Sequence, residues 1–354
     1  SLLYAVFFIA NFLVRFPYTS DGQWRLTASA VILLLIWWSY IGFKISTGFK
    51  MLNYVAVSSI LCALILFGIE LNLAGSFEVL QQIRYGLVLD GSRGLAAVGF
   101  ILPITTVLLF MLWLKSKLSL YLALSFVGLF LTGLNGSRTA LMLIFFPVLM
   151  TLGYLFFMSN LHKKVKYLSA IMVLIVFTSL AWMAKPKILE TISDYNSLQN
   201  NNYTTSMGMR IAMWDVGYQS AVDSLLLGVG PSQYKSYITE QVQKSNYHDS
   251  VRQFISSAMQ IHNQYLMTTI LTGITGLITL ILFLGYPFKV AIKAYSLKES
   301  RPIILTALGL MIGIYFVMFF GAILTFSYTT IFYVMAASGI VSLFDNHNQV
   351  KKNA

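Results

Sequence analysis

One histidine stands where the long polar stretch of this chain meets an apolar helix, and its type and position suit it to move a proton. His262 is followed by Asn263, Gln264 and Tyr265, and an apolar run begins directly after them. The N-terminal end of a helix carries a positive dipole, which disfavours an imidazolium. The ring is therefore expected to be neutral and able to accept a proton from a hydroxyl. The alternative is a structural hydrogen-bonding role, which is the commoner role of a lone histidine at a membrane interface.

An arginine and a tryptophan in the same polar stretch have the spacing of neighbours on one helix. Residues 207–227 show the apolar periodicity of an amphipathic helix, and Arg210 and Trp214 lie four positions apart on it, hence on a common face. Arginine binds phosphate or carboxylate through a planar, bidentate fork that lysine lacks. The run Gly228-Val229-Gly230-Pro231 is expected to end this helix.

Two other short segments place an arginine at the predicted outer start of an apolar helix. They are Asp90-Gly91-Ser92-Arg93-Gly94 and Asn135-Gly136-Ser137-Arg138-Thr139, each with a turn and a serine in the N-cap position. Free N–H groups at a helix start, beside an arginine, form an anion site. The loop of Arg138 is too short to need an arginine for solubility, so we interpret Arg138 as functional. For Arg93, capping and contact with lipid headgroups explain the pattern equally well.

The rest of the chain is apolar enough to lie in a membrane. Of its 354 residues 57% are hydrophobic and 10% charged, and the mean hydropathy is +0.74, which excludes an ordinary soluble domain. Ten segments approach or reach the ~17–25 apolar residues that span a bilayer. They are 1–14, 27–43, 51–69, 95–114, 119–133, 139–158, 167–184, 263–285, 303–319 and 323–343.

Lysine and arginine divide between alternate loops. One side of the predicted membrane receives thirteen basic residues and only two acidic ones, and the positive-inside rule makes that side cytoplasmic. Twelve of the sixteen lysines lie there, whereas seven of the eight arginines lie on the other side. The net charge of +12 therefore reflects membrane orientation, and no nucleic-acid partner is expected. Among the outer arginines, Arg15 and Arg25 are interpreted as headgroup anchors.

These observations predict an all-α, polytopic helical membrane protein with one large outer loop that contains helices. We divide it into N-terminal membrane helices at 1–184, a loop with the catalytic residues at 185–262, and C-terminal membrane helices with a cytoplasmic tail at 263–354. Ser1 opens within an apolar run without a methionine, so we expect the natural N-terminus to lie before this sequence.

Signatures of several other chemistries are missing from the sequence. It contains no P-loop, G-x-S-x-G or H-E-x-x-H motif and no acidic or Cys/His ligand set on the outer side, so no metal or cofactor is expected. Cys62 is the lone cysteine and is interpreted as a packing residue. The predicted spans hold almost no charged residues, which weighs against an ion-coupled transporter.

The chain resembles the O-antigen ligase family, which is related to O-antigen polymerases and bacterial protein O-oligosaccharyltransferases. The resemblance rests on the order and spacing of four pieces between about 130 and 285. They are Leu134-Asn135-Gly136-Ser137-Arg138-Thr139-Ala140, Arg210 with Trp214, Gly228-Val229-Gly230, and His262-Asn263-Gln264-Tyr265 leading into Leu271-Thr272-Gly273-Ile274-Thr275-Gly276. Family members usually have about twelve membrane helices, which fits two helices missing before Ser1.

The resemblance implies a metal-independent, GT-C-like glycosyltransferase of the bacterial inner membrane with its active site facing the periplasm. It would move a glycan from an undecaprenyl-pyrophosphate carrier onto a sugar hydroxyl of the lipid A-core. His262 would act as the general base, and Arg210 and Arg138 would stabilise the departing pyrophosphate. The expected substrate-binding residues are Arg93, Trp214, Asn263, Gln264, Tyr265, Gly228 and Gly230, and the other partners are membrane lipids.

Three alternatives remain open from the sequence. A polymerase or a protein O-oligosaccharyltransferase of the same superfamily would differ in its acceptor. A polysaccharide or lipid transporter would need a polar path through the membrane. A non-catalytic scaffold of a polysaccharide assembly complex would keep the topology without needing clustered arginines and a histidine.

Overall fold

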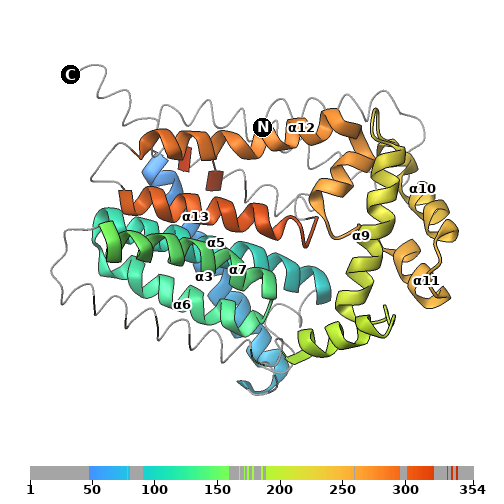
Figure 1. The fold of residues 1–354 in the computed structure, drawn as a ribbon. Coiled ribbons are helices and arrows are strands. Elements are labelled where there is room, and N and C mark those ends of the chain that lie inside the picture. Colours follow the sequence, from blue (N-terminus) through green and yellow to red (C-terminus); the bar gives the residue numbers. More distant parts are fainter. Residues whose placement is uncertain are drawn as a thin grey trace. The chain divides into compact units, whose positions relative to one another are not determined.

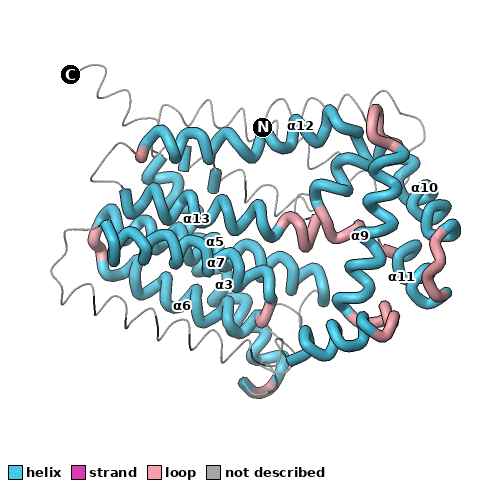
Figure 2. Tube along the Cα trace, in the orientation of Figure 1, coloured by secondary structure: helices cyan, strands magenta, loops and turns pink. Residues whose placement is uncertain are grey.

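The structure, a computed structural model, describes residues 48–77, 79, 91–158, 189–258, 260–295 and 301–322. It also describes the isolated positions 167, 171, 174, 178, 185, 333, 336, 337, 340 and 341. Within these residues the regular structure is entirely helical and no strand occurs (Figure 2), which confirms the predicted all-α fold. The spans expected at 1–14, 27–43, 167–184 and 323–343 lie wholly or mostly outside the described residues.

The chain divides into two compact units. The described part of the first comprises 189–258, 260–286, 318–322 and 333, and we refer to it as the His262 unit. The second, the bundle unit, consists mainly of 48–77, 91–158, 287–295 and 301–317.

Five predicted spans correspond to helices whose residues lie in the bundle unit (Figure 1). They are α3 (Gly48–Ala74), α5 (Gly91–Ser116), α6 (Ser119–Asn135), α7 (Arg138–Gly153) with its π-helical extension Tyr154–Met158, and α13 (Arg301–Val317). Four of the described helical segments are long and apolar enough to cross a membrane: Ala56–Ala74, Val98–Ser116, Thr139–Phe157 and Gln264–Ala294. The fold is thus that of a multi-pass helical membrane protein.

One acidic residue departs from the expectation that the spans are almost free of charge. Because α3 extends to Ala74, five residues beyond the predicted span, Glu70 lies inside the helix and is buried at 2% exposure. It stands near the predicted outer end of that helix.

The bundle helices approach each other closely at small residues. A Cβ added to Gly309 of α13 would lie 2.6 Å from the carbonyl oxygen of Phe146 in α7. A few residues further along, the hydroxyls of Thr151 and Thr306 share a hydrogen bond of 2.6 Å. Between α5 and α6, the Ser125 hydroxyl donates to the carbonyl of Thr106 at 3.2 Å. Close backbone approach at small residues and hydroxyl hydrogen bonds are how helices associate where water supplies no hydrophobic driving force.

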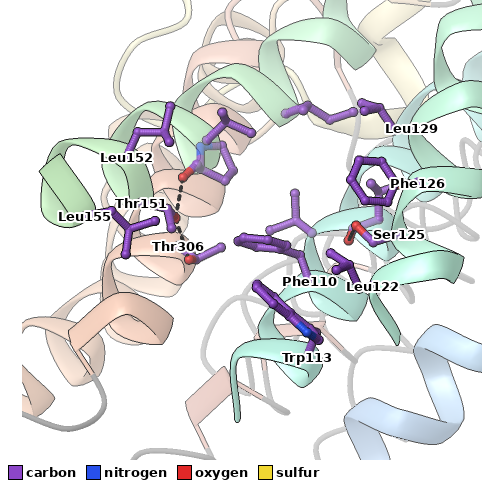
Figure 3. Close-up of a pocket in the computed structure, with 15 residues that line it drawn as sticks. Phe110, Trp113, Leu122, Ser125, Phe126, Leu129, Thr151, Leu152, Leu155 and Thr306 are labelled. Atoms are coloured by element: carbon purple, nitrogen blue, oxygen red, sulfur yellow. Dashed lines mark hydrogen bonds between the residues drawn. The ribbon is translucent and has the colours of Figure 1, made fainter. Parts of the chain in front are cut away.

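An apolar cavity of about 310 Å³ remains between α5, α6, α7 and α13. Figure 3 shows Phe110 and Trp113 at one side, Leu122 and Phe126 at another, and the Thr151–Thr306 hydrogen bond at the wall formed by α7 and α13. The threonine hydroxyls are engaged with each other and with backbone carbonyls, so the cavity offers hydrocarbon contacts to a ligand.

The His262 unit holds the long polar segment, which is helical for most of its length (Figure 1). A helical stretch at 189–199 is followed by α9 (Ser206–Asp223), α10 (Gly230–Lys244), α11 (Asp249–Ser257) and the first part of α12 (Gln264–Ala294). Asp194 ties the first stretch to α9, because its carboxylate accepts a hydrogen bond from Met207 N at 3.2 Å. Thr205 caps the same helix by accepting from Gly208 N at 3.1 Å.

The expected helix at 207–227 is confirmed in place but was predicted too long. It ends at Asp223, and Leu227 is 74% exposed rather than part of its buried face. The expectation that Gly228-Val229-Gly230-Pro231 ends this helix was wrong, since α9 ends before this run and Pro231 lies in the first turn of α10. A proline is tolerated there because the first N–H groups of a helix have no internal acceptor.

Candidate active site

His262 occupies the turn that leads into α12. Its backbone is left-handed, with φ of +52°, a conformation in which histidine, asparagine and aspartate are enriched among non-glycine residues. The next residue, Asn263, caps the helix by accepting a hydrogen bond from Leu266 N at 3.0 Å. Non-glycine residues held at positive φ are concentrated at functional sites, and here the conformation turns the chain sharply at the histidine.

Helix α9 holds this turn in place from the side. The indole Nε1 of Trp214 donates a hydrogen bond to the backbone carbonyl of His262 at 3.2 Å. One turn further along α9, Gly217 lets the helix approach closely, because a Cβ there would lie 2.6 Å from Ile261 Cγ2. Trp214 thus fixes the backbone of His262. The face of α9 that carries Trp214 and Arg210 is turned toward His262.

The imidazole of His262 is neutral near pH 7. Burial, and secondarily the positive charge of Arg210, lower the pKa of His262 from 6.5 to about 4. Both side chains are half-buried, so the arginine acts on the ring through a medium that screens less than bulk water. The neutral ring agrees with the expectation from the sequence, although burial rather than the helix dipole is the main cause.

The hydrogen bond from Trp214 fixes the backbone of His262 and not its ring. Among the described residues no protein group forms a hydrogen bond with the imidazole nitrogens, whereas the carbonyl of the same residue is fixed by Trp214. A catalytic base is often oriented by a third group. In the described part of the chain, no such group fixes the tautomer of His262.

A segment far away in sequence completes the surroundings. The carbonyl of Met318 accepts a hydrogen bond of 2.8 Å from Gln264 N. The ring of Phe319 packs on Tyr265 with 4.6 Å between centroids, and that of Phe320 packs on Trp214 with 5.6 Å. Sequence reasoning missed these three residues. The available signal was that the short loop between the spans 303–319 and 323–343 falls on the same predicted side as His262.

The glycine turn after α9 is inserted into a break in α12. The N–H of Ile274 donates to Leu225 O and the N–H of Val229 donates to Ile270 O, both at 2.7 Å, so two bonds to the turn replace one bond of the helix. The break is at Gly273, where φ is +71°. A Cβ on Gly228 would lie 2.4 Å from the N of Thr272. Backbone groups freed inside an apolar helix must find such partners, and this glycine permits the approach.

Several predicted binding residues make contacts that already explain their presence. Asn263 caps α12, the amide of Gln264 donates to the Thr268 hydroxyl at 3.3 Å, and Tyr265 packs on Phe319. Gly228 packs on α12, and Gly230, with φ of +78°, begins α10. Roles of these residues in binding a substrate stay predictions.

The two loop arginines lie in the bundle unit, at the starts of their helices. Arg93 is in the first turn of α5, and Arg138 is the first residue of α7; their side chains are outside the described part. Ser137 is the N-cap of α7, as predicted, but its hydroxyl bonds to Thr139 Oγ1 at 2.6 Å and not to a backbone N–H. The Ser137 side chain therefore does not satisfy a backbone donor at this helix start.

Within the described ranges, no three His, Cys, Asp or Glu side chains cluster as a metal site would require. Two carboxylates of the polar segment have other partners: Asp194 binds the start of α9, and Asp215 accepts from Tyr247 and Gln219. Independence from metals stays a prediction that a chelator can test.

The fold is that of a multi-pass helical membrane protein, and its His262 unit brings a neutral histidine, an arginine and a tryptophan together. Residues 120–281, a segment that contains Arg138, Arg210 and His262, match the family model described as O-antigen ligase. The chain is also similar to an uncharacterized protein of Haemophilus influenzae, with 28% identity over 114 residues. That similarity covers 32% of this chain and 28% of the relative.

Proposed function

We propose that the protein is an O-antigen ligase of the bacterial inner membrane. It transfers a glycan from undecaprenyl pyrophosphate to a sugar hydroxyl of the lipid A-core on the periplasmic side. The observation that carries this proposal is the pairing of a neutral, half-buried His262 with Arg210, whose charge helps to lower the pKa of the ring. One side chain can take a proton, and the other can bind a phosphate.

The transfer step needs these two functions together. The acceptor hydroxyl oxygen attacks the anomeric carbon of the donor, and the bond between that carbon and the pyrophosphate oxygen breaks. The leaving pyrophosphate takes the electron pair, while the hydroxyl proton passes to a ring nitrogen of His262. Return of that proton to the pyrophosphate or to solvent restores the neutral histidine. Positioning the two substrates makes the attack effectively unimolecular.

Donor binding would tune the base. In the free enzyme a pKa of about 4 makes His262 neutral but weakly basic. A pyrophosphate held by Arg210 places negative charge beside the ring and offsets the arginine, and opposite charge raises the pKa of an imidazole. The base would then strengthen only when the donor is bound, toward the neutral range where general bases are most effective.

The leaving group needs positive charge, and the arginines are its proposed source. Arg210 contributes from α9, and we assign Arg138 and, secondarily, Arg93 to the same pyrophosphate from the starts of α7 and α5. This arrangement would replace the divalent cation that many glycosyltransferases use. The apolar cavity of the bundle unit supports an apolar ligand, such as part of a lipid tail.

The acceptor decides between this proposal and its relatives. An O-antigen polymerase would transfer the glycan to a second carrier-linked glycan, and a protein O-oligosaccharyltransferase would transfer it to a protein hydroxyl. A transporter would translocate the glycan without forming a glycosidic bond.

Reconstitution separates these possibilities. Purified protein in lipid nanodiscs is supplied with a carrier-linked glycan, EDTA, and one acceptor at a time: lipid A-core, carrier-linked glycan, or an acceptor protein. We expect the conjugate with lipid A-core alone, without nucleotide or metal. A product only from two carrier-linked glycans would assign the polymerase. Loss of activity in EDTA, restored by Mg²⁺ or Mn²⁺, would contradict the metal-independent mechanism.

A further inference from the structure

A large polar groove lies in the His262 unit on the far side of α9 from Trp214. It has a volume of about 1060 Å³ and is bounded by the turn 200–204, by α9 and by the connection between α10 and α11. The side chains that matter for its chemistry are Asn202, Tyr203, Asp215, Gln219, Asn246 and Tyr247. Its volume stands at the upper end of the ~300–1,000 Å³ found for ligand pockets, so it has room for a chain of several small units.

The walls of the groove are held together by interactions between residues far apart in sequence. The Tyr247 hydroxyl donates to one carboxylate oxygen of Asp215 at 2.9 Å, and the Gln219 amide donates to the other at 3.4 Å. The rings of Tyr203 and Tyr247 meet edge to face with 5.0 Å between centroids. Burial and the neighbouring carboxylate raise the pKa of Tyr247, so its hydroxyl remains protonated at physiological pH.

The turn at 200–204 is an ordered wall of this groove. Asn202 accepts hydrogen bonds from Thr204 N at 3.0 Å and from the Thr204 hydroxyl at 2.6 Å. The Asn202 N–H bonds back to Ser197 O at 3.0 Å, and Asn201 takes a positive φ of 56°. The run of asparagines at 200–202 thus forms a closed turn, and all three side chains are exposed.

The composition of the groove selects a ligand class. Amide and hydroxyl groups offer both donors and acceptors, and the two tyrosines offer flat apolar faces. The charged groups are few, and Lys244 is already paired with Glu240 at 2.8 Å. An anion site would need free cationic groups, and a lipid tail would need apolar walls. A ligand rich in hydroxyls, with some apolar C–H faces, fits both features, and this description is that of a carbohydrate.

The groove and His262 share α9 but use different sides of it. Asp215 and Gln219 lie about 140° and 180° around the helix from Arg210, at 100° per residue, whereas Trp214 contacts His262 from the arginine's side. A helix with its side chains is ~10–12 Å across. A sugar in the groove would therefore be at least one helix diameter away from the reacting sugar at His262.

We propose that this groove binds an oligosaccharide at sugars beyond the reacting end, and so favours long glycans as substrates. The inference rests on the proposed glycan transfer for its place in the reaction. Binding of a free oligosaccharide would establish the groove independently. The glycan can be that of the donor or that of the acceptor, since both present the same chemistry.

The test measures binding before it measures transfer. The full-length protein in nanodiscs is titrated with two probes: the oligosaccharide released by mild acid from the donor's glycan, and the core oligosaccharide released from the acceptor. Binding is followed by calorimetry and by saturation-transfer NMR. The variant Gln219→Ala/Asn246→Ala removes two exposed amides of the groove, and Gln253→Ala removes an exposed amide of α11 outside it. Exposed substitutions of this kind rarely alter stability, and thermal unfolding verifies this for each variant.

We expect one of the probes to bind, the double variant to weaken that binding at least tenfold through two lost hydrogen bonds, and Gln253→Ala to bind as the wild type does. The identity of the probe tells whether the groove serves donor or acceptor. If the donor's oligosaccharide is the probe that binds, the ratio of transfer rates for a many-repeat and a one-repeat donor should fall in the double variant. Absence of binding by both probes, or equal binding by the double variant and the wild type, would refute the proposal that the groove binds an oligosaccharide. Binding without any transfer by the wild type would instead overturn the proposed function and leave the groove standing.

Discussion

Replacement of His262 by asparagine isolates the chemistry of the imidazole from the shape of the turn. Asparagine tolerates the left-handed φ of 52° at this position, whereas alanine would add ~1–2 kcal/mol of backbone strain. If His262 takes the hydroxyl proton, His262→Asn should lower the rate of transfer by ~10²–10⁴-fold. Donor binding should be largely retained, because the proposed phosphate ligand is Arg210.

The pH dependence of kcat/KM for the wild type gives a more quantitative test than the substitution does. With a pKa of about 4, ~90% of the ring is neutral at pH 5, against ~3% for an ordinary histidine. For the free enzyme, kcat/KM should therefore keep about nine-tenths of its plateau value at pH 5. An unperturbed base would give a value ~30-fold lower at that pH.

The donor-bound enzyme should titrate differently. Negative charge beside the ring raises its pKa, by ~1–3 units for a close partner, and the profile of kcat reports the bound state. The acidic limb of kcat should thus lie at higher pH than the limb of kcat/KM. Removing the positive charge with Arg210→Gln should move the kcat/KM limb upward, while the larger effect of burial remains.

Initial rates in nanodiscs, at saturating and at limiting donor between pH 4 and 8, measure both limbs. Half-loss of kcat/KM near pH 6.5 would refute the buried, neutral base. A rate that rises as the pH falls would assign His262 to cationic phosphate binding instead. Normal turnover of His262→Asn at saturating donor would remove the residue from catalysis.

The same titration has a consequence for stability that needs no substrate. The unfolded ring takes up a proton near pH 6.5 but the folded ring only near pH 4, so between these values the unfolded state binds more protons. The stabilising contribution is fully present above pH 6.5 and is lost as the pH falls toward 4. At ~1.4 kcal/mol per pH unit this amounts to at most about 3.5 kcal/mol. Thermal unfolding of the wild type and of His262→Asn should therefore differ in acid sensitivity, and parallel pH dependence would contradict the lowered pKa.

Three other predictions concern the fold, the arginine and the topology. Gly228→Ala should cost at least ~2 kcal/mol of stability, since its Cβ would lie 2.4 Å from Thr272 N at positive φ, whereas Gly285→Ala, with open space around it, should be neutral; equal unfolding temperatures would contradict the inserted turn. Arg210→Lys keeps the charge but loses the bidentate fork, so the KM for the donor should rise about tenfold or more, and unchanged donor use would make the arginine an anchor. A cysteine at Ser197 should react with an impermeant reagent in intact spheroplasts and one at Ser116 should not; the reverse pattern would invert the topology.

Hydropathy predicted the described membrane helices because a helix that spans a lipid bilayer needs apolar side chains along its whole length. The ends were less predictable. Glycine followed by proline can mark the end of one helix or the start of the next. The run from Gly228 to Pro231 leads into α10, whereas α9 ends before it, at Asp223. Gly228 therefore closes the turn after α9, and Pro231 lies in the first turn of α10. This placement depends on the contact of the turn with α12, which the local sequence does not show.

The site was predictable where side-chain spacing on one helix determines it. Arg210 and Trp214 share a face because they are four residues apart, and Asn263 was expected at the start of α12. The groove opposite them was not predictable, because it joins the asparagine turn to Tyr247 across more than forty residues of sequence. Its composition was visible as Tyr, Gln and Asn, but a polar composition is equally ordinary in a solvated loop.

What the sequence conceals is that this site is assembled through backbone groups. The carbonyls of His262, Met318 and Ile270 accept the hydrogen bonds that join α9, the segment after α13 and the glycine turn to α12. Side-chain patterns report which face is buried but say nothing about which carbonyl is used. The sequence indicates such a backbone contact only by the small residue that lets two segments approach closely, as at Gly228. Trp214 fixes the carbonyl of His262 and not its ring, so this contact, which side-chain patterns do not reveal, is compatible with the proposed role of the ring as a base.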